Sequence, residues 1–371
     1  MKKVTDGRRV HLKVVYNGKN ITQDLTGYLT SFQYNDAKPG EQDDISLTVV
    51  DKDRKWSKAW TPVVGDIIKV EIRLINWYKE GEKLSLYPGA FEVDTVELSG
   101  PPDTVNIKAM AIPITGGPAL REKRSKAWEK VRLRTVAQEI ATRAKLKLAY
   151  EVNDNPLYDR LEQSDQTDLE FLQDTTKKEG ISLKVSGSSL VLYDEAKFES
   201  QKPVLSFAYG KANIISYSFS VSESNASYAS CEVTYTSTKT ASKTKKKKDK
   251  KTGDAKTAAA DDKKKDAKTS TTISGKYVIP GAKGPVLKVN EKVESIAEAN
   301  KLAKNKLREK NKEAGLAKLT VMGDTRLAAG CTITISGFGR FDGKYIIVSA
   351  SHALSGGAYA TDMDIRKVLT Y

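Results

Sequence analysis

Alternating hydrophobic and polar residues dominate the first third of the chain. Residues 11–16 and 45–50 alternate with a period of two, and Asn17-Gly18 follows the first run. An alternating run that ends in an Asn-Gly turn is typical of a half-buried strand in a hairpin. Further strands are predicted at residues 67–74, 91–98 and 105–109. Short strands at this spacing predict a first β-barrel module, or a sandwich, over residues 1–120.

The hydrophobic period changes from two to that of a helix after Gly116-Gly117-Pro118. Apolar residues recur every three or four positions over 133–144, and Thr135 and Gln138 have capping-box spacing, which predicts a helix to about residue 145. A second helix is predicted from Thr167 and Glu170, which repeat that spacing, to Gly180 at the C-cap, and a hairpin follows at 181–193. Residues 121–202 are therefore predicted to form a small α/β domain.

Strand patterns return after residue 203. They occur at 214–221 and 230–235, and again from 317 almost to Tyr371. Between them, a capping box at Ser295 and Glu298 predicts a helix at 295–314. Residues 203–371 are thus predicted to form a second β-barrel module, and the predicted fold class is α+β, mainly β.

A lysine-rich segment at 239–272 interrupts the second module. It has no aromatic and no branched aliphatic residue from Thr240 to Thr269. Such a stretch cannot bury enough apolar surface to offset a chain entropy of roughly 1–2 kcal/mol per residue, so a disordered insertion loop is predicted. Three roles stay open for the run Lys245–Lys248: a solvated loop, contact with an acidic partner, or salt-dependent binding to nucleic acid or a membrane surface.

The distribution of charge weakens the nucleic-acid hypothesis. The chain carries a formal charge of +15, and between Lys239 and Ser270 there are 13 Lys and 5 Asp, which account for +8 of it. The other residues carry +7, with both signs interspersed as on an ordinary solvated surface. The lysine-rich segment also lacks the interleaved aromatic residues on which bases stack.

One pattern occurs twice in the chain, about 260 residues apart. Residues 65–70, 89–93 and 98–100 have the same order of glycine turns and strands as residues 330–335, 343–347 and 354–356. Two similar β modules in one chain would explain this echo, although turn-strand-turn patterns also recur by chance in β proteins. If the echo is real, three chains present six similar modules.

Length and composition exclude several protein classes. The chain has 371 residues, enough for two or three cores, and its mean hydropathy is −0.49 with no apolar run near ~18 residues, so a membrane span is not expected. The N-terminus lacks the apolar stretch of a signal peptide. Only two cysteines and two histidines are present, without a CxxC motif, so neither a disulfide framework nor a cofactor or metal site is predicted. Folding in a reducing cytoplasm is expected.

Two segments resemble a known family. The sequence DRLEQSDQTDLEFL at residues 159–172, followed by Gly180 and a hairpin, resembles the late control D family of contractile phage tails, whose members form the baseplate hub. A second match starts with GFGRFDGKY at residues 337–345 and leads to Ser351-His352, as the last strands of that family do. The resemblance implies two modules like the tail tube protein and a hub that joins a hexameric tube to a trimeric spike.

Several residues have side chains that could carry chemistry. Asp165, Asp168 and Glu170 lie at a predicted helix start, where negative charge favours the helix dipole, so capping is preferred to glycan cleavage by paired carboxylates. His352 and Cys331 have strand-like surroundings and are interpreted as structural rather than nucleophilic. His11 and Cys231 suggest no further chemistry. The glycines of 281–284 and 339–344 lack the spacing of a phosphate-binding loop, so no catalytic, cofactor-binding or metal-binding residue is assigned.

These observations predict a non-enzymatic, homotrimeric baseplate hub of a contractile phage tail or a phage-tail-like bacteriocin. The expected partners are the tail tube protein, a trimeric spike protein encoded separately and other baseplate proteins, without specific nucleic acid or membrane insertion. Its expected place is the tail baseplate, after assembly in the bacterial cytoplasm. The alternatives are a tail-associated cell-wall hydrolase or carbohydrate-binding module, and a non-specific nucleic-acid-binding protein.

Overall fold

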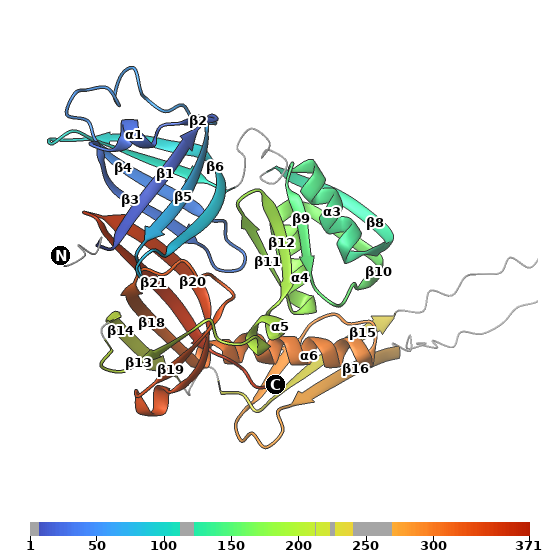
Figure 1. Ribbon diagram of the computed structural model, residues 1–371. Coiled ribbons are helices and arrows are strands. Elements are labelled where there is room, and N and C mark those ends of the chain that lie inside the picture. Colours follow the sequence, from blue (N-terminus) through green and yellow to red (C-terminus); the bar gives the residue numbers. More distant parts are fainter. Residues whose placement is uncertain (1–6, 112–121, 212, 223–226, 240–268) are drawn as a thin grey trace, which may run out of the picture. The chain divides into compact units, whose positions relative to one another are not determined.

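The chain forms two compact units. The computed structural model describes residues 7–111, 122–211, 213–222, 227–239 and 269–371 (Figure 1). The first unit contains the residues up to 227 together with 308–371, and the second contains 228–307. The first unit holds two β-barrel modules and an α/β region.

The first module consists of seven strands and a short helix. Their bounds are β1 (Arg9–Tyr16), β2 (Lys19–Asn20), α1 (Thr22–Leu25), β3 (Leu29–Asp36), β4 (Asp44–Val50), β5 (Ile67–Ile75), β6 (Lys83–Ser99) and β7 (Thr104–Met110). They pair in the order β3-β4-β7-β6-β5-β1-β2. Alternate residues of β4, such as Ile45, Leu47 and Val49, are fully buried, as the period of two predicts.

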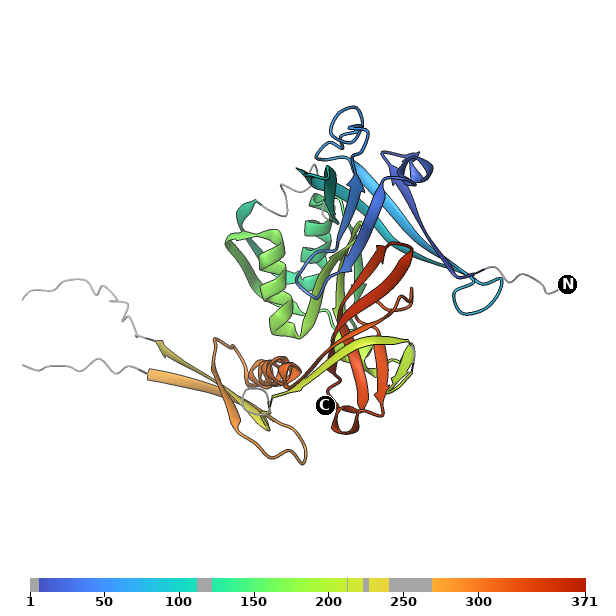
Figure 2. The same ribbon diagram turned by 90° about the vertical axis from the view of Figure 1, so that its left-hand side faces the viewer.

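The α/β region lies between the two modules in the sequence. It contains β8 (Lys123–Arg132), α3 (Leu133–Arg143), β9 (Lys147–Glu151), β10 (Leu157–Thr167), α4 (Asp168–Glu179), β11 (Ile181–Ser186), β12 (Ser189–Asp194) and α5 (Glu195–Ser200). The strands β11, β12 and β9 form one small sheet, and α3 and α4 lie side by side on one face of it (Figure 2). The polar strands β8 and β10 pair with each other and were not predicted, because charged residues fill both of their faces.

The helices of this region follow one sequence prediction and correct another. Thr167 and Glu170 form the predicted capping box of α4, and Gly180 ends that helix in the left-handed conformation with φ of 74°. Helix α3 begins two residues before the predicted cap, and no side chain at its own N-cap accepts a hydrogen bond. Its first amides instead donate to the Pro156 carbonyl and the Asn155 side chain, at 3.0 and 3.1 Å, so a distant loop replaces the capping box.

The second module repeats the strand plan of the first. Its elements are β13 (Leu205–Ala208), β14 (Ile214–Val221), the 3-10 turn η1 (Lys312–Ala314), β18 (Gly315–Met322), β19 (Thr332–Ser336), the 3-10 turn η2 (Gly339–Phe341), β20 (Gly343–Ser355) and β21 (Ala358–Lys367). They pair in the order β14-β18-β21-β20-β19-β13. If the two-residue strand β2 is left out and the other strands are ranked along the chain, both modules have the strand order 2-3-6-5-4-1. The direction of pairing differs only in the last pair, since β13 and β19 are parallel whereas β1 and β5 are antiparallel.

The repeat extends to individual hydrogen bonds. In the first module, the Gly65 amide donates to the Val93 carbonyl and the Val93 amide donates to the Asp66 carbonyl. In the second module, the Gly330 amide donates to the Ile347 carbonyl and the Ile347 amide donates to the Cys331 carbonyl, and all four bonds are 2.8–2.9 Å long. Both glycines have φ near 90°, which the preceding turn requires. The next residue pair is a β-bulge in each case, between Val93 and Thr95 and between Ile347 and Ser349. The sequence echo is therefore a structural repeat.

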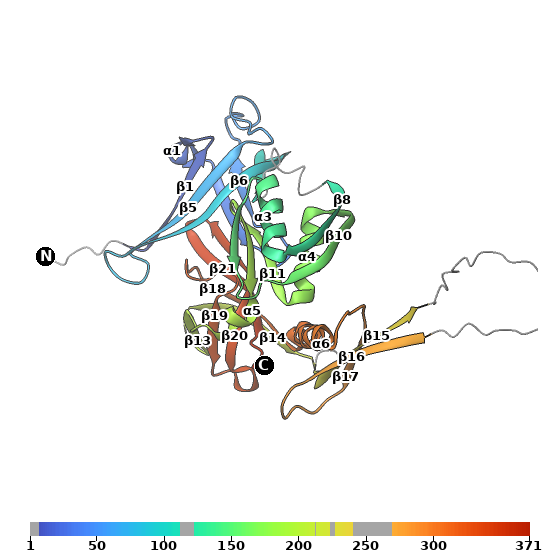
Figure 3. The same cartoon turned by 90° about the vertical axis from the view of Figure 1, so that its right-hand side faces the viewer.

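The second unit is an insertion in the sequence of the second module. It lies between β14 and β18, where the first module has only the short connection from β3 to β4, and it contains β15 (Ser230–Lys239), β16 (Thr269–Val278), β17 (Val286–Asn290) and the start of α6 (Ile296–Asn311). Helix α6 packs on the sheet β16-β15-β17 (Figure 3). Gly275 permits this close packing, because a Cβ atom there would lie 2.5 Å from the Cβ of Ala299.

Most of the predicted loop at 239–272 lies outside the described residues. Its two ends, Lys239 and residues 269–272, belong to the paired strands β15 and β16. The predicted helix at 295–314 is confirmed as α6 followed by η1, and Ser295 Oγ accepts the Glu298 amide at 3.1 Å. Across the described ranges, no helix is long and apolar enough to cross a membrane. The predicted fold class, mainly β with two barrel modules and an α/β region between them, is confirmed.

Candidate functional site

The two modules share one continuous sheet, and their junction is the candidate functional site. Strand β20 pairs with β21 on one side and with β3 of the first module on the other. The registers Ala350↔Asp36 and Ser355↔Ser31 bound six antiparallel pairs. Strand β19 stops pairing with β20 at Ile346, so β3 takes over the edge that β19 leaves free.

His352 lies at the centre of this junction and is fully buried. Its ring stacks on Tyr34 of β3 with centroids 5.8 Å apart. Its Nε2 lies 2.9 Å from the Leu327 carbonyl and its Nδ1 lies 2.6 Å from the Tyr359 hydroxyl. Because a carbonyl can only accept, Nε2 carries the proton and Nδ1 accepts from Tyr359.

The surroundings of His352 keep its ring neutral. Burial lowers its pKa from 6.5 to about 4, because an imidazolium loses its hydration there. Both ring nitrogens are occupied by Leu327 and Tyr359, which leaves neither to activate a nucleophile. The geometry therefore agrees with the structural interpretation of this histidine.

The hairpin between β5 and β6 makes a second contact between the modules. Trp77 Nε1 donates to the Gly323 carbonyl at 2.7 Å, and the Tyr78 hydroxyl donates to Asp324 at 2.5 Å. The Trp77 ring also packs on Tyr359, with centroids 5.8 Å apart. Aromatic side chains with satisfied polar groups are well suited to a permanent interface.

A buried charge cluster ties the α/β region to both modules. Lys184 of β11 forms ion pairs with Asp36 of β3 and with Asp43, the latter at 3.0 Å. Asp36 also accepts the Ala329 amide of the second module at 2.6 Å. Burial raises the pKa of Asp43, Lys184 opposes that shift, and neighbouring Asp36 adds to it. Asp43 is completely buried, so this pair of carboxylates is not available to a glycan.

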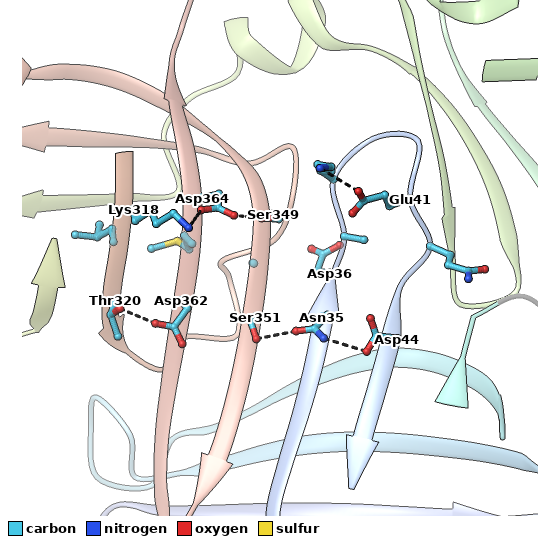
Figure 4. Close-up of a pocket in the computed structure, with 16 residues that line it drawn as sticks. Asn35, Asp36, Glu41, Asp44, Lys318, Thr320, Ser349, Ser351, Asp362 and Asp364 are labelled. Atoms are coloured by element: carbon cyan, nitrogen blue, oxygen red, sulfur yellow. Dashed lines mark hydrogen bonds and ion pairs between the residues drawn. The ribbon is translucent and has the colours of Figure 1, made fainter. Parts of the chain in front are cut away.

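A shallow groove crosses the junction above these buried groups. Its volume is about 540 Å³, and its lining residues come from β3, β4, the connection between these two strands, β18, β20 and β21 (Figure 4). Asp44, Asn35 and Ser351 form one hydrogen-bonded row at 3.0 and 2.8 Å, which Thr320 and Asp362 continue with a bond of 2.5 Å. The side chains of this row therefore bind one another across the boundary between the modules.

The groove belongs to a wider face that is polar from one module to the other. Eight neighbouring strands, from β14 to β6, contribute alternate side chains to it. Its polar members include Ser216, Ser218, Ser220, Lys318, Thr320, Asp362, Asp364, Ser349, Ser351, Ser355, Ser31, Gln33, Asn35, Asp44, Ser46, Thr48, Thr104, Asn106, Lys108, Thr95, Glu97 and Ser99. Hydroxyl and amide groups predominate among these residues, which include four carboxylates and two ammonium groups.

The structure separates the acidic residues that the sequence grouped at a helix start. Glu170 caps α4 as predicted. Asp168 is completely buried and accepts from Arg143 Nε at 2.9 Å and from Gln163 at 3.0 Å, so its main role is an ion pair. Asp165 is not at the helix at all; it lies in the irregular part of β10 with φ of 49°. The capping interpretation is thus wrong for Asp165 and incomplete for Asp168.

The remaining candidates that lie in the described part of the chain are not surrounded by other groups that could form a site. Burial raises the pKa of the Cys231 thiol to about 11, and burial also raises the pKa of the Cys331 thiol above its usual value, so both stay protonated at neutral pH. His11 is exposed on β1. Residues 281–284 form a turn before β17, and 339–344 form η2 and the start of β20. The run Lys245–Lys248 lies outside the described residues, and the described part of the chain holds no group of three or more metal-ligating residues.

Sequence reasoning missed the residues that build the junction. Tyr34, Asp36, Asp43, Trp77 and Lys184 come from four separate elements, and none has a local motif. Only His352, through its place in a family-like segment, was singled out. Strand β3 itself was not predicted from the sequence, and no local pattern indicates that β20 is its neighbour.

Comparison with known proteins gives one match at the level of a family. The family model described as "Phage tail baseplate hub (GPD)" matches residues 119–358, which is more than half of the chain. A "Probable baseplate hub protein" of Escherichia phage P2 is 26% identical over 179 residues, which is 48% of this chain and 43% of that protein. The chain thus spans less than half the length of the named relatives that it matches.

Two solved structures share the whole fold. A tail protein from Neisseria meningitidis MC58 has a TM-score of 0.66 at 12% identity, over 98% of this chain and 97% of that one. The 43 kDa tail protein of prophage MuSo2 from Shewanella oneidensis has a TM-score of 0.65 at 14% identity, over 96% and 98%. At such low identity the likeness concerns the fold, while the family match confirms the resemblance that residues 159–172 and 337–352 indicated.

Proposed function

Since the chain belongs to the phage tail baseplate hub (GPD) family, we propose that it is a structural hub at the base of a contractile phage tail or a phage-tail-like bacteriocin. Three copies form a ring of six β modules that joins a hexameric tail tube to a trimeric spike. The observation that carries this proposal is the repeat: both modules have the same strand order, the same bulges and the same turn hydrogen bonds.

The repeat supplies the symmetry that such an adaptor needs. A closed ring requires each subunit to offer matching surfaces to its neighbours. Two similar modules in each chain give a trimer six similar positions, which a six-fold tube can meet with one kind of contact. The junction through β20 and β3 fixes the angle between the modules of one chain, because six pairs of residues and the His352–Tyr34 stack hold it.

The polar face of the joined sheet is the proposed wall of the central channel. The polar residues of this face carry mostly hydroxyl and amide groups, and none of them is aromatic. A chain that passes through the channel would therefore find no aromatic side chain among these residues to which it could adhere. The other face is apolar and forms the module cores. A sheet with one packed and one solvated face suits a wall that encloses water.

A mechanical role without catalysis is part of the proposal. His352 has both ring nitrogens engaged, both thiols are protonated, and Asp43 is sealed from solvent. The expected partners are the tube protein, the spike and other baseplate proteins, and assembly is expected in the bacterial cytoplasm. The division into domains at 1–120, 121–202 and 203–371 remains part of the proposal, with the second unit as an insertion in the last.

Measurement of the solution mass tests the central claim. Light scattering on the purified chain is expected to give about three times 40.8 kDa, independent of salt, and two-dimensional class averages are expected to show a ring with six lobes. A mass of one chain at every concentration and salt tested, with no ring in the images, would contradict the proposal. Release of sugar from peptidoglycan by the purified chain would contradict the non-enzymatic part.

A further inference from the structure

We propose that the ring is closed by a strand pair between copies: the free edge of β6, at residues 96–99, pairs antiparallel with the free edge of β14, at residues 218–221, of the next copy. The register is the one that β20 and β3 have within a chain. This interface rests on the proposed ring of three chains and names the edges and residues that form it.

The template is the junction that the chain makes with itself. In β20, pairing with β19 ends at Ile346, the bulge follows, and pairing with β3 begins at Ala350. In β6, pairing with β5 ends at Glu92, the bulge follows, and residues beyond it pair with β7 alone. Among the described residues no strand occupies the side of β6 that corresponds to the β3 position.

The equivalent residues follow from the strand registers. Val93 corresponds to Ile347, because both accept and donate the same turn hydrogen bonds and precede the same bulge. Ser216 corresponds to Ser31, because each is the first paired residue after a bulge, opposite Thr320 and Thr48 respectively. Counting from these anchors, β6 is the counterpart of β20 and β14 is the counterpart of β3 at every paired position.

This correspondence gives a definite register between copies. The junction pairs Ala350↔Asp36, Ser351↔Asn35, His352↔Tyr34 and Ala353↔Gln33 translate into Val96↔Val221, Glu97↔Ser220, Leu98↔Phe219 and Ser99↔Ser218. Pairing is expected to stop there, because Pro101 and Pro102 follow and have no amide hydrogen to donate. The contact between copies is therefore two pairs shorter than the junction within the chain.

The side chains on both edges fit this partner. Leu98 is 55% exposed, and Tyr217 and Val221 are 49% and 42% exposed, which is unusual for large apolar residues beside unpaired strand edges. Leu98 occupies the position that corresponds to His352, and Phe219 occupies the position that corresponds to Tyr34. The side chains of Leu98 and Phe219 would therefore pack together between copies, as the His352 and Tyr34 rings stack within the chain. Phe219 already lies in an aromatic group with Phe338 and Phe341, with centroids 5.0 and 5.4 Å away, which Leu98 would cover.

A disulfide placed in the predicted register tests the interface. The double variant Glu97→Cys/Ser220→Cys is expected to oxidise between copies, because opposed residues of antiparallel strands have Cα atoms about 4.5–5.5 Å apart, within disulfide reach. A non-reducing gel is then expected to show a band of three chains that reduction converts to one. Both positions are exposed, so the substitutions leave the cores intact.

The chain offers matched controls. Ser351→Cys/Asn35→Cys places the same pair at the junction within one chain, where the register is known, and is expected to oxidise without joining copies. Glu97→Cys/Ser216→Cys shifts the partner by four residues, roughly 13 Å along the strand, and is expected not to form the band. The unmodified chain, run on the same non-reducing gel, shows whether the native Cys231 and Cys331 form disulfides between copies.

The outcomes separate the interface from the proposed function. A trimer by light scattering that never forms the Glu97–Ser220 bridge, while the Ser351–Asn35 control oxidises, overturns the interface and leaves the hub proposal standing. A ladder longer than three chains supports the edges and overturns the closed ring. A monomer without any bridge between copies overturns both.

Discussion

Acid is expected to weaken the junction between the modules through His352. The ring is buried and neutral, with its pKa lowered to about 4, whereas an unfolded histidine titrates near 6.5. Between these values the unfolded chain binds one more proton than the folded chain, so the free energy of unfolding falls as the pH falls. A gap of about 2.5 pH units corresponds to roughly 3 kcal/mol, complete below about pH 4.

The assay compares variants that differ only in this titration. Urea unfolding followed by tryptophan fluorescence at pH 7.5 and 4.5 gives the loss of unfolding free energy for each protein. His352→Gln keeps a donor for Leu327 and an acceptor for Tyr359 but does not titrate, so its loss is expected to be smaller than that of the unmodified chain by about 2–3 kcal/mol.

The second histidine of the chain supplies the control. His11 is exposed on β1, so His11→Gln is expected to retain the full pH dependence of the unmodified chain. Equal losses for the unmodified chain and His352→Gln would refute the reasoning, because the carboxylates common to both would then account for all of the acid sensitivity.

Three further perturbations test other parts of the structure. Leu98→Lys is expected to weaken association between copies roughly tenfold or more, since burial of a leucine contributes about 1.5–3 kcal/mol. Tyr87→Lys changes an exposed residue of the same strand outside the proposed contact and is expected to leave association unchanged. Equal dissociation constants for the two variants by sedimentation would contradict the β6 interface. Lys184→Met leaves two buried carboxylates without their cation and is expected to lower the unfolding free energy by about 3–5 kcal/mol at pH 7. This loss should shrink at pH 5, as protonation of Asp43, whose pKa burial raises, removes the uncompensated charge; a pH-independent loss would be evidence against the charge cluster. Thr167→Ala removes the capping box of α4 and is expected to cost about 0.5–2 kcal/mol in thermal or urea unfolding, and no measurable change would show that the cap is dispensable.

Local chemistry made some elements predictable from the sequence. The capping box at Thr167 and the glycine at position 180 need only residues within one helix, so they could be recognised and are present. The turn glycines at 65 and 330 are equally local, because a positive φ is required whatever surrounds them. The repeat was therefore visible in the sequence before any pairing was known.

Elements stabilised by distant residues were not predictable in the same way. Helix α3 starts at Leu133 because Asn155 and Pro156, more than 20 positions later, accept its amide hydrogens. Strands β8 and β10 carry charges on both faces, so neither alternation nor apolar character marks them. The pairing of β20 with β3 joins residues more than 300 positions apart, and hydrophobic pattern alone does not select a partner over such a distance.

The insertion of the second unit makes one connection of the second module different from its counterpart in the first. Where the first module passes from β3 to β4 through seven residues, Ala37 to Asp43, the second carries residues 228–307. In the proposed ring every other module would bear this unit, while the paired strands keep the same registers throughout. A protein that recognises the strands would then find six similar places, and one that recognises the inserted unit would find three. A longer connection in one module would thus be enough for copies of a single chain to offer six binding positions to one partner and three to another.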